Sequence, residues 1–261
     1  MLKVMSFNIR CANCDDGENN WENRKSMVLA RIQAFQPDLI GIQECRDDAQ
    51  AEYLKANLPE YYFYGVQRGG GGETALEMAP ILFRKASFQI LQSGYFWLSE
   101  TPKIPGSKGW DAVFARTATW VQLLHQLTGR TFVFLNTHFD YQPTAIEGAA
   151  NLLRQWMEGG LQRYPLILTG DFNADKNSSA YQCLIEDGML FDVHRQVRPD
   201  GEDEPTFHGF GDPALSSPID WILASQRFEV LSASVDTSHY GSLYPSDHFP
   251  ILTELMLESK S

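Results

Sequence analysis

The sequence has 261 residues, of which 43% are hydrophobic and 12% aromatic, and its formal net charge is −12. These values exclude a disordered chain, and no apolar run approaches the roughly 18 residues that would cross a membrane. The acidic balance disfavours non-specific attraction to polyanions, which depends on Lys and Arg. The start, MLKVMSFNIR, turns polar too soon for a signal peptide. We therefore expect a cytoplasmic chain with a single domain over residues 1–261.

Strand-like apolar runs recur along the whole chain. They are KVMSFNI (3–9), DLIGIQ (38–43), PILFR (80–84), TWVQLL (119–124), TFVFLNT (131–137), LILTG (166–170), IDWILAS (219–225) and FPILTEL (249–255).

Helical patterns separate some of these runs. Residues 24–36 place Val28, Ile32 and Phe35 on one face, and residues 146–158 carry a second apolar face that Gly159 and Gly160 end. A third, short helix is predicted from an N-cap at Ser178 to Gly188. Strands and helices mixed over the whole length predict one α/β domain.

Two further segments have features of binding sites, but the sequence favours a structural role for each of them. The run QRGGGGETA (67–75) lacks the GK[ST] ending of a phosphate-binding loop, so it is interpreted as a mobile connection. Cys11 and Cys14 have the CxxC spacing, but no second pair of ligands completes a zinc site. We expect reduced loop thiols there.

Polar side chains gather where the predicted strands end or begin. Each of them alone is typical of a turn or of a satisfied buried group. Together, however, crowded carboxylates require a cation between them, and oxygen ligands favour Mg²⁺ or Mn²⁺ over Zn²⁺. Two histidines with carboxylate neighbours would complete a site for phosphoester hydrolysis. The residues are Asn8, Glu44, Asn136, His138, Asp140, Asp171, Asn173, Asp220, Asp247 and His248.

Six short segments that contain these residues resemble the motifs of the endonuclease/exonuclease/phosphatase family, in its order and over nearly the whole chain. They are SFNIR, IGIQE, NTHFD, GDFN, IDWI and SDHFP. WENR, FWLSETP, GW and TFHGF resemble a bacterial branch akin to the deadenylases. The resemblance implies a four-layer α/β sandwich, in which two mixed β-sheets pack face to face with flanking helices. It also implies a Mg²⁺-dependent or Mn²⁺-dependent phosphoester hydrolase.

The resemblance also implies roles for individual residues. Metal binding falls to Glu44, with Asn8 and Asp247 nearby. Asp171 would orient or deprotonate the attacking water, and Asn173 would bind a phosphoryl oxygen or help hold the metal. His248, paired with Asp220, and His138, oriented by Glu77, would contact the phosphate. Substrate binding is implied for Arg116, Asn136 and Asp140.

The chain departs from the branch pattern after Asp140, where Tyr141 replaces a histidine and the segment QPTAIEGAA lacks a basic helix start. This departure puts the substrate contact of that segment in doubt. Trp97, Trp110, Phe207 and His208 are equally typical of a substrate pocket and of core packing.

Three functions remain open on sequence alone. The complete catalytic set on an acidic chain favours hydrolysis of a small phosphorylated compound over nucleic acid, with no membrane and no obligate protein partner. A nuclease would need a local basic strip, for which the candidates are Arg24, Lys25, Arg68, Arg84, Lys85, Lys103, Lys108 and Arg116. A non-catalytic binding module is the third alternative.

Overall fold

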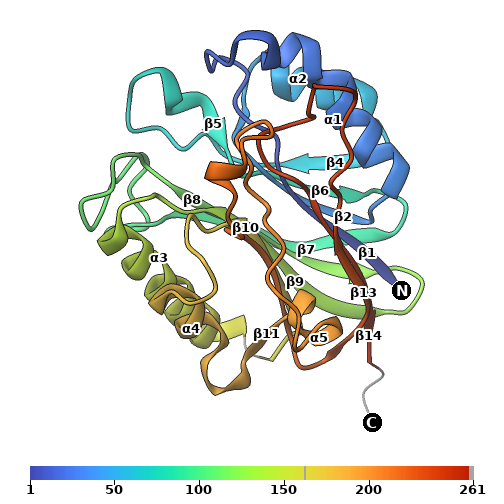
Figure 1. Cartoon of the computed structure of the whole chain (residues 1–261). Coiled ribbons are helices and arrows are strands. Elements are labelled where there is room, and N and C mark those ends of the chain that lie inside the picture. The colour runs from blue at the N-terminus through green and yellow to red at the C-terminus, as the bar shows by residue number, and fades with distance from the viewer. Residues whose placement is uncertain (162, 259–261) are drawn as a thin grey trace.

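The computed structural model describes residues 1–161 and 163–258, and its framework is two six-stranded sheets (Figure 1). In spatial order the first sheet contains β13 (Phe228–Val235), β14 (Ile251–Leu257), β1 (Leu2–Asn8), β2 (Leu39–Gln43), β6 (Ile81–Arg84) and β4 (Tyr61–Tyr64). The second contains β11 (Leu190–Asp192), β12 (Asp220–Ser225), β10 (Leu166–Asp171), β9 (Arg130–His138), β8 (Thr117–His125) and β7 (Phe88–Trp97). A small ribbon joins β3 (Cys45–Arg46) to β5 (Glu77–Met78).

Both large sheets are mixed. The pairs β1–β2 and β9–β10 are parallel, and the other pairs are antiparallel. The central strands β2 and β10 are buried along their whole length, which explains their near-continuous apolar sequence. Sequence analysis missed the short strands β3 and β5 and the four edge strands of the large sheets, β4, β7, β11 and β13; of these, β7 and β13 carry several exposed residues. Their apolar pattern is therefore diluted.

Helices cover the outer faces of the two sheets. α1 (Trp21–Phe35) begins three residues before the predicted helix, because the Asn20 side chain accepts a hydrogen bond from the backbone of Asn23 and caps it there. α2 (Ala49–Asn57) was not predicted. α3 (Pro143–Trp156) likewise starts earlier than expected, with proline in its first turn, and a π-helical turn, Met157–Leu161, follows it. α4 (Ser179–Ile185) has the predicted Ser178 cap and continues into a 3-10 turn, Glu186–Gly188.

The remaining helical segments are short. They are α5 (Val193–Val197) and the 3-10 turns Gly17–Asn19, Glu73–Leu76 and Pro213–Leu215. Within the described part of the chain, none of the helices combines the length and the apolar character that crossing a membrane requires.

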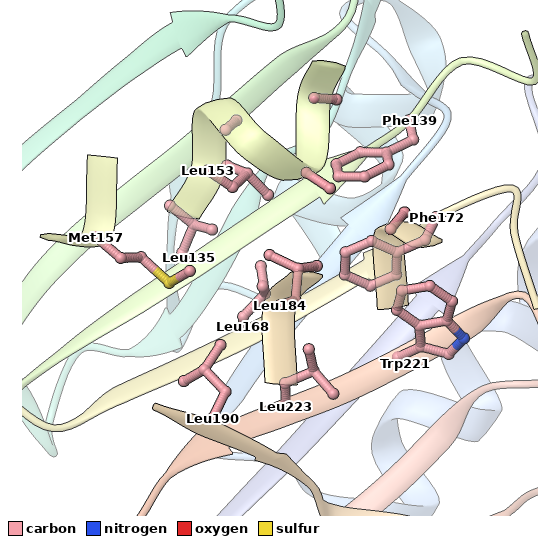
Figure 2. Packing of buried hydrophobic residues seen from close by; sticks show 14 of the residues in the cluster. Leu135, Phe139, Leu153, Met157, Leu168, Phe172, Leu184, Leu190, Trp221 and Leu223 are labelled. Carbon is pink, nitrogen blue, oxygen red and sulfur yellow. The ribbon is translucent and has the colours of Figure 1, made fainter. Parts of the chain in front are cut away.

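Three buried apolar clusters separate the layers. One lies between α1, α2 and the first sheet, one between the two sheets, and one between the second sheet and the helices α3 and α4. In the last cluster Phe172 stacks on Trp221 with ring centroids 4.2 Å apart, and Leu153, Leu168 and Leu223 pack beside them (Figure 2). The predicted four-layer sandwich is confirmed.

A buried polar bridge crosses the space between the two sheets. Asn136 on β9 donates hydrogen bonds to the carbonyls of Ile42 (2.7 Å) and Pro80 (3.0 Å), and its Oδ1 accepts from Gln43 Nε2 (2.7 Å) and Thr169 Oγ1 (3.0 Å). Its side chain is fully buried. Asn136 was predicted to bind substrate, whereas in this structure its side chain joins one sheet to the other.

Candidate active site

Three functional side chains stand in one row across the second sheet. In the register of the strands, Asp171 on β10 pairs with His138 on β9 and with Asp220 on β12. Asn8 ends β1, the neighbouring strand of the first sheet, and its side chain reaches Asp171. The ends of four strands therefore deliver polar groups to one edge of the sandwich.

Asp171 is the centre of this row. Its Oδ2 accepts a hydrogen bond from Asn8 Nδ2 (2.9 Å) and lies 3.3 Å from Nε2 of His138, while its Oδ1 accepts from the backbone of Asn173 (3.0 Å). Burial and the charge of Asp220 raise the pKa of Asp171 to about 7. A carboxylate with a pKa near neutrality is suited to accept a proton from water.

The two histidines have opposite electrostatic surroundings. Nδ1 of His248 lies 2.8 Å from Oδ2 of Asp220, the pairing that the sequence predicted. Burial acts to lower the pKa of His248, but the charges of Asp220 and Asp171 outweigh it and raise the pKa to about 10. Burial, reinforced by Arg116 and other cations, holds the pKa of His138 well below its ordinary value. At neutral pH, His248 is therefore a cationic donor and His138 a neutral ring.

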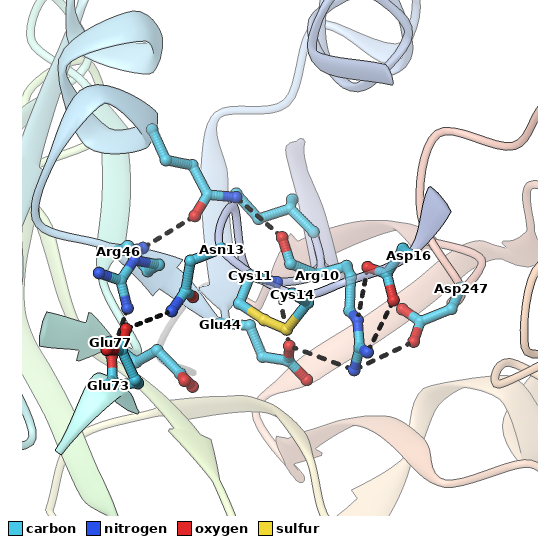
Figure 3. Close-up of a disulfide and its surroundings, with 12 residues drawn as sticks. Arg10, Cys11, Asn13, Cys14, Asp16, Glu44, Arg46, Glu73, Glu77 and Asp247 are labelled. Atoms are coloured by element: carbon cyan, nitrogen blue, oxygen red, sulfur yellow. Dashed lines mark hydrogen bonds and ion pairs between the residues drawn. A yellow bond between two sulfur atoms is a disulfide. The ribbon is translucent and has the colours of Figure 1, made fainter. Parts of the chain in front are cut away.

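The carboxylates Glu44 and Asp247 lie on either side of a cation, Arg10. The Arg10 guanidinium is 3.9 Å from Glu44 Oε2 and 3.6 Å from Asp247 Oδ2 (Figure 3). Burial acts to raise the pKa of Glu44, but Arg10 and a hydrogen bond from Asn8 Nδ2 (3.0 Å) lower it overall. Glu44 has a φ of 60°, a conformation that is uncommon for residues other than glycine and often found at functional sites.

Asn173 also has a left-handed backbone, with a φ of 48°. This turn directs its Nδ2 back to the carbonyl of Phe139 (2.9 Å) and to within 3.3 Å of His138 Nε2. Ligand atoms of Glu44, His138 and Asp171 all lie within 4.8 Å of one another. This set of donors can hold a divalent cation.

Two buried arginines, Arg68 and Arg116, form another part of the wall of this site, and we call them the arginine pair. Both guanidinium groups lie over the ring of Phe114, at 4.8 and 5.4 Å from its centroid. Arg68 is paired with Glu77 at 3.0 Å, whereas Arg116 Nε has no hydrogen-bond partner among the described residues. Glu77 was expected to orient His138, but among the described contacts its partner is Arg68.

Asp140 supports this wall from behind. Its Oδ2 accepts a hydrogen bond from the backbone of Phe114 (2.9 Å) and lies 3.9 Å from Arg116 Nε, and the side chain is buried. Asp140 does not line the cavity described next. Its contacts hold the arginine pair and its aromatic partner in place, instead of the direct substrate contact that was expected.

An open cavity of about 490 Å³ joins these groups, and we call it the edge cavity. Its lining includes Arg10, Glu44, Arg68, Glu77, Arg116, His138, Asp171, Asn173, Asp247 and His248. The edge cavity therefore brings carboxylates, histidines and the arginine pair together around one space.

The sequence was also compared with models of known protein families. The sequence profile of the Endonuclease/Exonuclease/phosphatase family matches residues 5–248. The chain belongs to this family. Its members are hydrolases that act on phosphoesters and depend on divalent metals, so the non-catalytic alternative is set aside.

Solved structures of the family superpose closely on this chain. An endonuclease/exonuclease/phosphatase from Bacteroides vulgatus is 35% identical, with a TM-score of 0.89 and coverage of 98% of this chain and 99% of the other. A mannosyl-6-phosphatase from Bacteroides thetaiotaomicron is 33% identical, with a TM-score of 0.85 and coverage of 98% and 100%. Nocturnin from Rattus norvegicus is 22% identical over 97% of this chain. The matched region spans only 65% of the length of nocturnin.

Several residues that line the edge cavity received no site role from the sequence, among them Arg10 and Arg68. Arg10 was part of the quoted motif SFNIR, and its place beside Glu44 follows from the turn that ends β1. Arg68 was considered only as part of a basic strip, although it directly precedes the glycine-rich loop. That loop is closed by backbone hydrogen bonds from Arg68 to Glu77 (2.8 Å) and from Gly69 to Ala75 (3.0 Å).

The four candidate aromatic residues divide between the two interpretations. Phe207 lines the edge cavity and packs on His248 with ring centroids 4.9 Å apart. Trp97 is buried and donates to the carbonyl of Arg68 (2.6 Å), and His208 is buried and stacked on Phe249. Trp110 lies against Gly148 of α3. Only Phe207 of these four lines the edge cavity.

The expectation of reduced thiols at Cys11 and Cys14 is contradicted. A turn at Ala12 and Asn13 brings the Cα atoms of the two cysteines to 5.6 Å. The structure joins them by a disulfide, which lies in the lining of the edge cavity (Figure 3). Cys45 and Cys183 are free.

Proposed function

We propose that the chain is a divalent-metal-dependent phosphomonoesterase that acts on a small phosphorylated compound, such as a sugar phosphate. One observation carries this proposal: buried arginines and a carboxylate and histidine cluster line the same cavity of about 490 Å³. This volume is in the range of sites for small molecules, and paired arginines suit a doubly charged phosphate group. The mannosyl-6-phosphatase of 33% identity supports the same substrate class.

The residues present fit a hard divalent cation. The positive charge of Arg10, placed between Glu44 and Asp247, supports a cation site at this corner. We propose Glu44 as the principal ligand, with Asn8 and Asp247 beside it, and Mg²⁺ as the ion because the ligand atoms are oxygens. When bound, such an ion polarises a phosphoryl oxygen and offsets developing negative charge.

The protein's own groups would carry the proton chemistry. Asp171 would accept a proton from the attacking water, held in place by Asn8 and the backbone of Asn173. His248, kept cationic by Asp220, would donate a hydrogen bond to a phosphoryl oxygen as charge develops there. Asn173 and neutral His138 would contact a second oxygen, and the arginine pair would bind the remaining phosphate charge.

The basic strip needed for a nuclease is not assembled in this structure. Arg24 is buried and donates to backbone carbonyls, including that of Arg10 (2.8 Å). Arg84 and Lys85 donate to the carbonyls of Pro37 (3.1 Å) and Pro59 (2.6 Å). Of the eight basic residues of the strip, only Arg68 and Arg116 line the edge cavity. These placements favour a small substrate over a nucleic acid backbone.

The test is hydrolysis by metal-stripped protein of hexose 6-phosphates, a chromogenic monoester and a chromogenic diester. Mg²⁺ or Mn²⁺ is added back, and Asp171→Asn runs alongside to exclude a contaminant. We expect metal-dependent release of phosphate from the monoesters and little cleavage of the diester. Preferential cleavage of the diester, with activity on oligonucleotides that falls steeply as salt rises, would replace this proposal with a nuclease.

Two broader expectations remain proposals. We propose that residues 1–261 form one domain, because the family profile covers residues 5–248 and the two sheets share an apolar cluster. A cytoplasmic location stays a prediction. The Cys11–Cys14 disulfide argues against it, because disulfides are common in oxidising compartments and rare in the cytosol.

A further inference from the structure

Cys11 and Cys14 lie directly beside the proposed metal ligand Glu44. The backbone N–H of Cys11 donates to Glu44 Oε2 at 3.1 Å, and both cysteines line the edge cavity. The two sulfur atoms and a carboxylate oxygen of Glu44 all lie within 4.8 Å of one another. Neither sulfur has a role in the proposed hydrolysis.

This trio has different ligand chemistry in its two redox states. As a disulfide, the sulfurs carry no charge and bind metals poorly, so Glu44 is available to a hard cation. As thiolates, the same sulfurs with Glu44 form a set of two sulfurs and one oxygen, which thiophilic cations such as Zn²⁺ prefer. Three protein ligands and one water complete a tetrahedral zinc site.

We propose that Cys11, Cys14 and Glu44 form a redox-controlled binding site for a thiophilic divalent cation, open only when the disulfide is reduced. Two electrons from a dithiol reductant open the site. One thiolate of the reductant attacks a cysteine sulfur, its second thiol closes the reductant into a cyclic disulfide, and Cys11 and Cys14 are released as thiols. Binding of the cation then displaces the two thiol protons.

Occupation of this site would withdraw Glu44 from the catalytic metal. A soft cation on the two sulfurs shares the Glu44 carboxylate and brings a second positive charge beside Arg10. Hydrolysis supported by Mg²⁺ should therefore be inhibited by Zn²⁺ more strongly in the reduced protein. This consequence rests on the proposed function, whereas binding of the cation does not.

The binding test uses Co²⁺ as a spectroscopic substitute for Zn²⁺. Protein is reduced with dithiothreitol, freed of reductant without oxygen, and titrated in parallel with the air-oxidised protein. We expect a thiolate-to-cobalt charge-transfer band in the near ultraviolet for the reduced protein and none for the oxidised protein. Cys14→Ser should weaken Co²⁺ binding in the reduced state by at least about tenfold, the lower end of the effect of an altered ligand environment.

Cys183→Ser is the matched control, because Cys183 is a free, half-buried cysteine on α4 outside the edge cavity. It should keep the redox-dependent band unchanged. A full-strength band in reduced Cys14→Ser, or none in the reduced wild type, overturns the site. Alkylation of both Cys11 and Cys14 in air-oxidised protein overturns the redox control. Thermal melting in circular dichroism confirms that Cys14→Ser is folded.

The inhibition test compares the two redox states with Mg²⁺ present. Zn²⁺ should inhibit phosphomonoester hydrolysis by the reduced wild type at a concentration at least about tenfold lower than for the oxidised protein. Equal inhibition of both states contradicts the link to Glu44. If no phosphoester is hydrolysed at all, the proposed function fails, and the cobalt band still decides the binding site.

Discussion

His248 lies between two carboxylates that sit opposite each other on neighbouring strands. Its Nδ1 is 2.8 Å from Asp220 Oδ2, and its Nε2 is 3.7 Å from Asp171 Oδ2. Because Asp171 and Asp220 are register partners on β10 and β12, the sheet itself fixes the distance between them. Their repulsion favours a proton on Asp171, whereas their joint attraction favours a proton on His248. One geometric arrangement therefore creates both a weak acid and a strong cation.

This arrangement predicts a bell-shaped pH profile. Asp171 must lose its proton to act as a base, so kcat/KM should fall as the pH drops below its pKa of about 7. His248 must keep its proton, so kcat/KM should fall again as the pH rises through about 10. The measurement is kcat/KM for monoester hydrolysis at saturating metal, from well below the lower limit to above the upper one. Asp220→Asn should move the alkaline limb to lower pH, and an unmoved limb would assign that limb to another group.

Loss of the proposed base or of the cationic histidine should remove most of the activity. We expect Asp171→Asn and His248→Ala each to lower kcat by about 10²–10⁴-fold, the usual range for general-base and charge-stabilising groups. Single-turnover rates at saturating metal separate this loss from weakened metal binding. His239→Ala is a suitable control, because His239 is outside the edge cavity. Near-normal turnover in either variant would remove that residue from the mechanism.

The arginine pair should determine how tightly a doubly charged phosphate binds. Arg116 lines the edge cavity, and Asp140 lies behind it at 3.9 Å from Nε, so the terminal N–H groups of the guanidinium are the ones that a phosphate can reach. Arg116→Ala should raise KM for a monoester by about 10–100-fold, the equivalent of one lost charge-assisted hydrogen bond. The effect on a singly charged diester should be smaller.

Lys85→Ala is the control for charge alone, because exposed Lys85 donates to a backbone carbonyl and does not line the edge cavity. Initial rates over a range of substrate concentrations provide KM for both ester types. Equal changes for monoester and diester in Arg116→Ala would contradict recognition of the second phosphate charge.

The sequence predicted which residues gather at this edge, but it did not predict which of them are covered by the other sheet and which reach the edge cavity. His138, Asp171 and Asp220 end or begin apolar strands, so their gathering at one edge follows from strand pairing. Asn136 and His138 are two residues apart and share one face of β9. Only the packing of the opposite sheet, with Gln43 over Asn136, decides that Asn136 is covered and that His138 reaches the edge cavity. No local pattern carries that information.

The same limit explains the other corrections. Glu77 and Arg68 lie on opposite sides of the glycine-rich loop, and their pairing depends on how backbone hydrogen bonds close that loop. The disulfide depends on the turn at Ala12 and Asn13, and Arg10 just before it has a left-handed backbone that its residue type does not favour. Strained backbone at functional positions is where reasoning from local preferences is expected to fail.

The close approach of the two sheets beneath the site provides a last prediction. A Cβ added to Gly41 on β2 would lie 2.5 Å from Asn136 Oδ1 and still closer to Thr169 Oγ1, and hydrogen bonds hold both of these side chains. Gly41→Ala should therefore push the sheets apart and destabilise the fold by about 1–3 kcal/mol or more, the usual cost of overpacking. Because Asn136 and His138 share a strand, kcat should fall as well.

Urea unfolding at 25 °C measures the free energy of unfolding for this variant. Gly159→Ala is the matched control, since an added Cβ there meets no atom of the described residues within 4 Å and its effect should stay within about 0.5 kcal/mol. If the Gly41→Ala protein is as stable as the wild type, Asn136 and Thr169 can move aside at little cost in free energy. The hydrogen bonds of Asn136 would then not fix the position of His138 at the edge cavity.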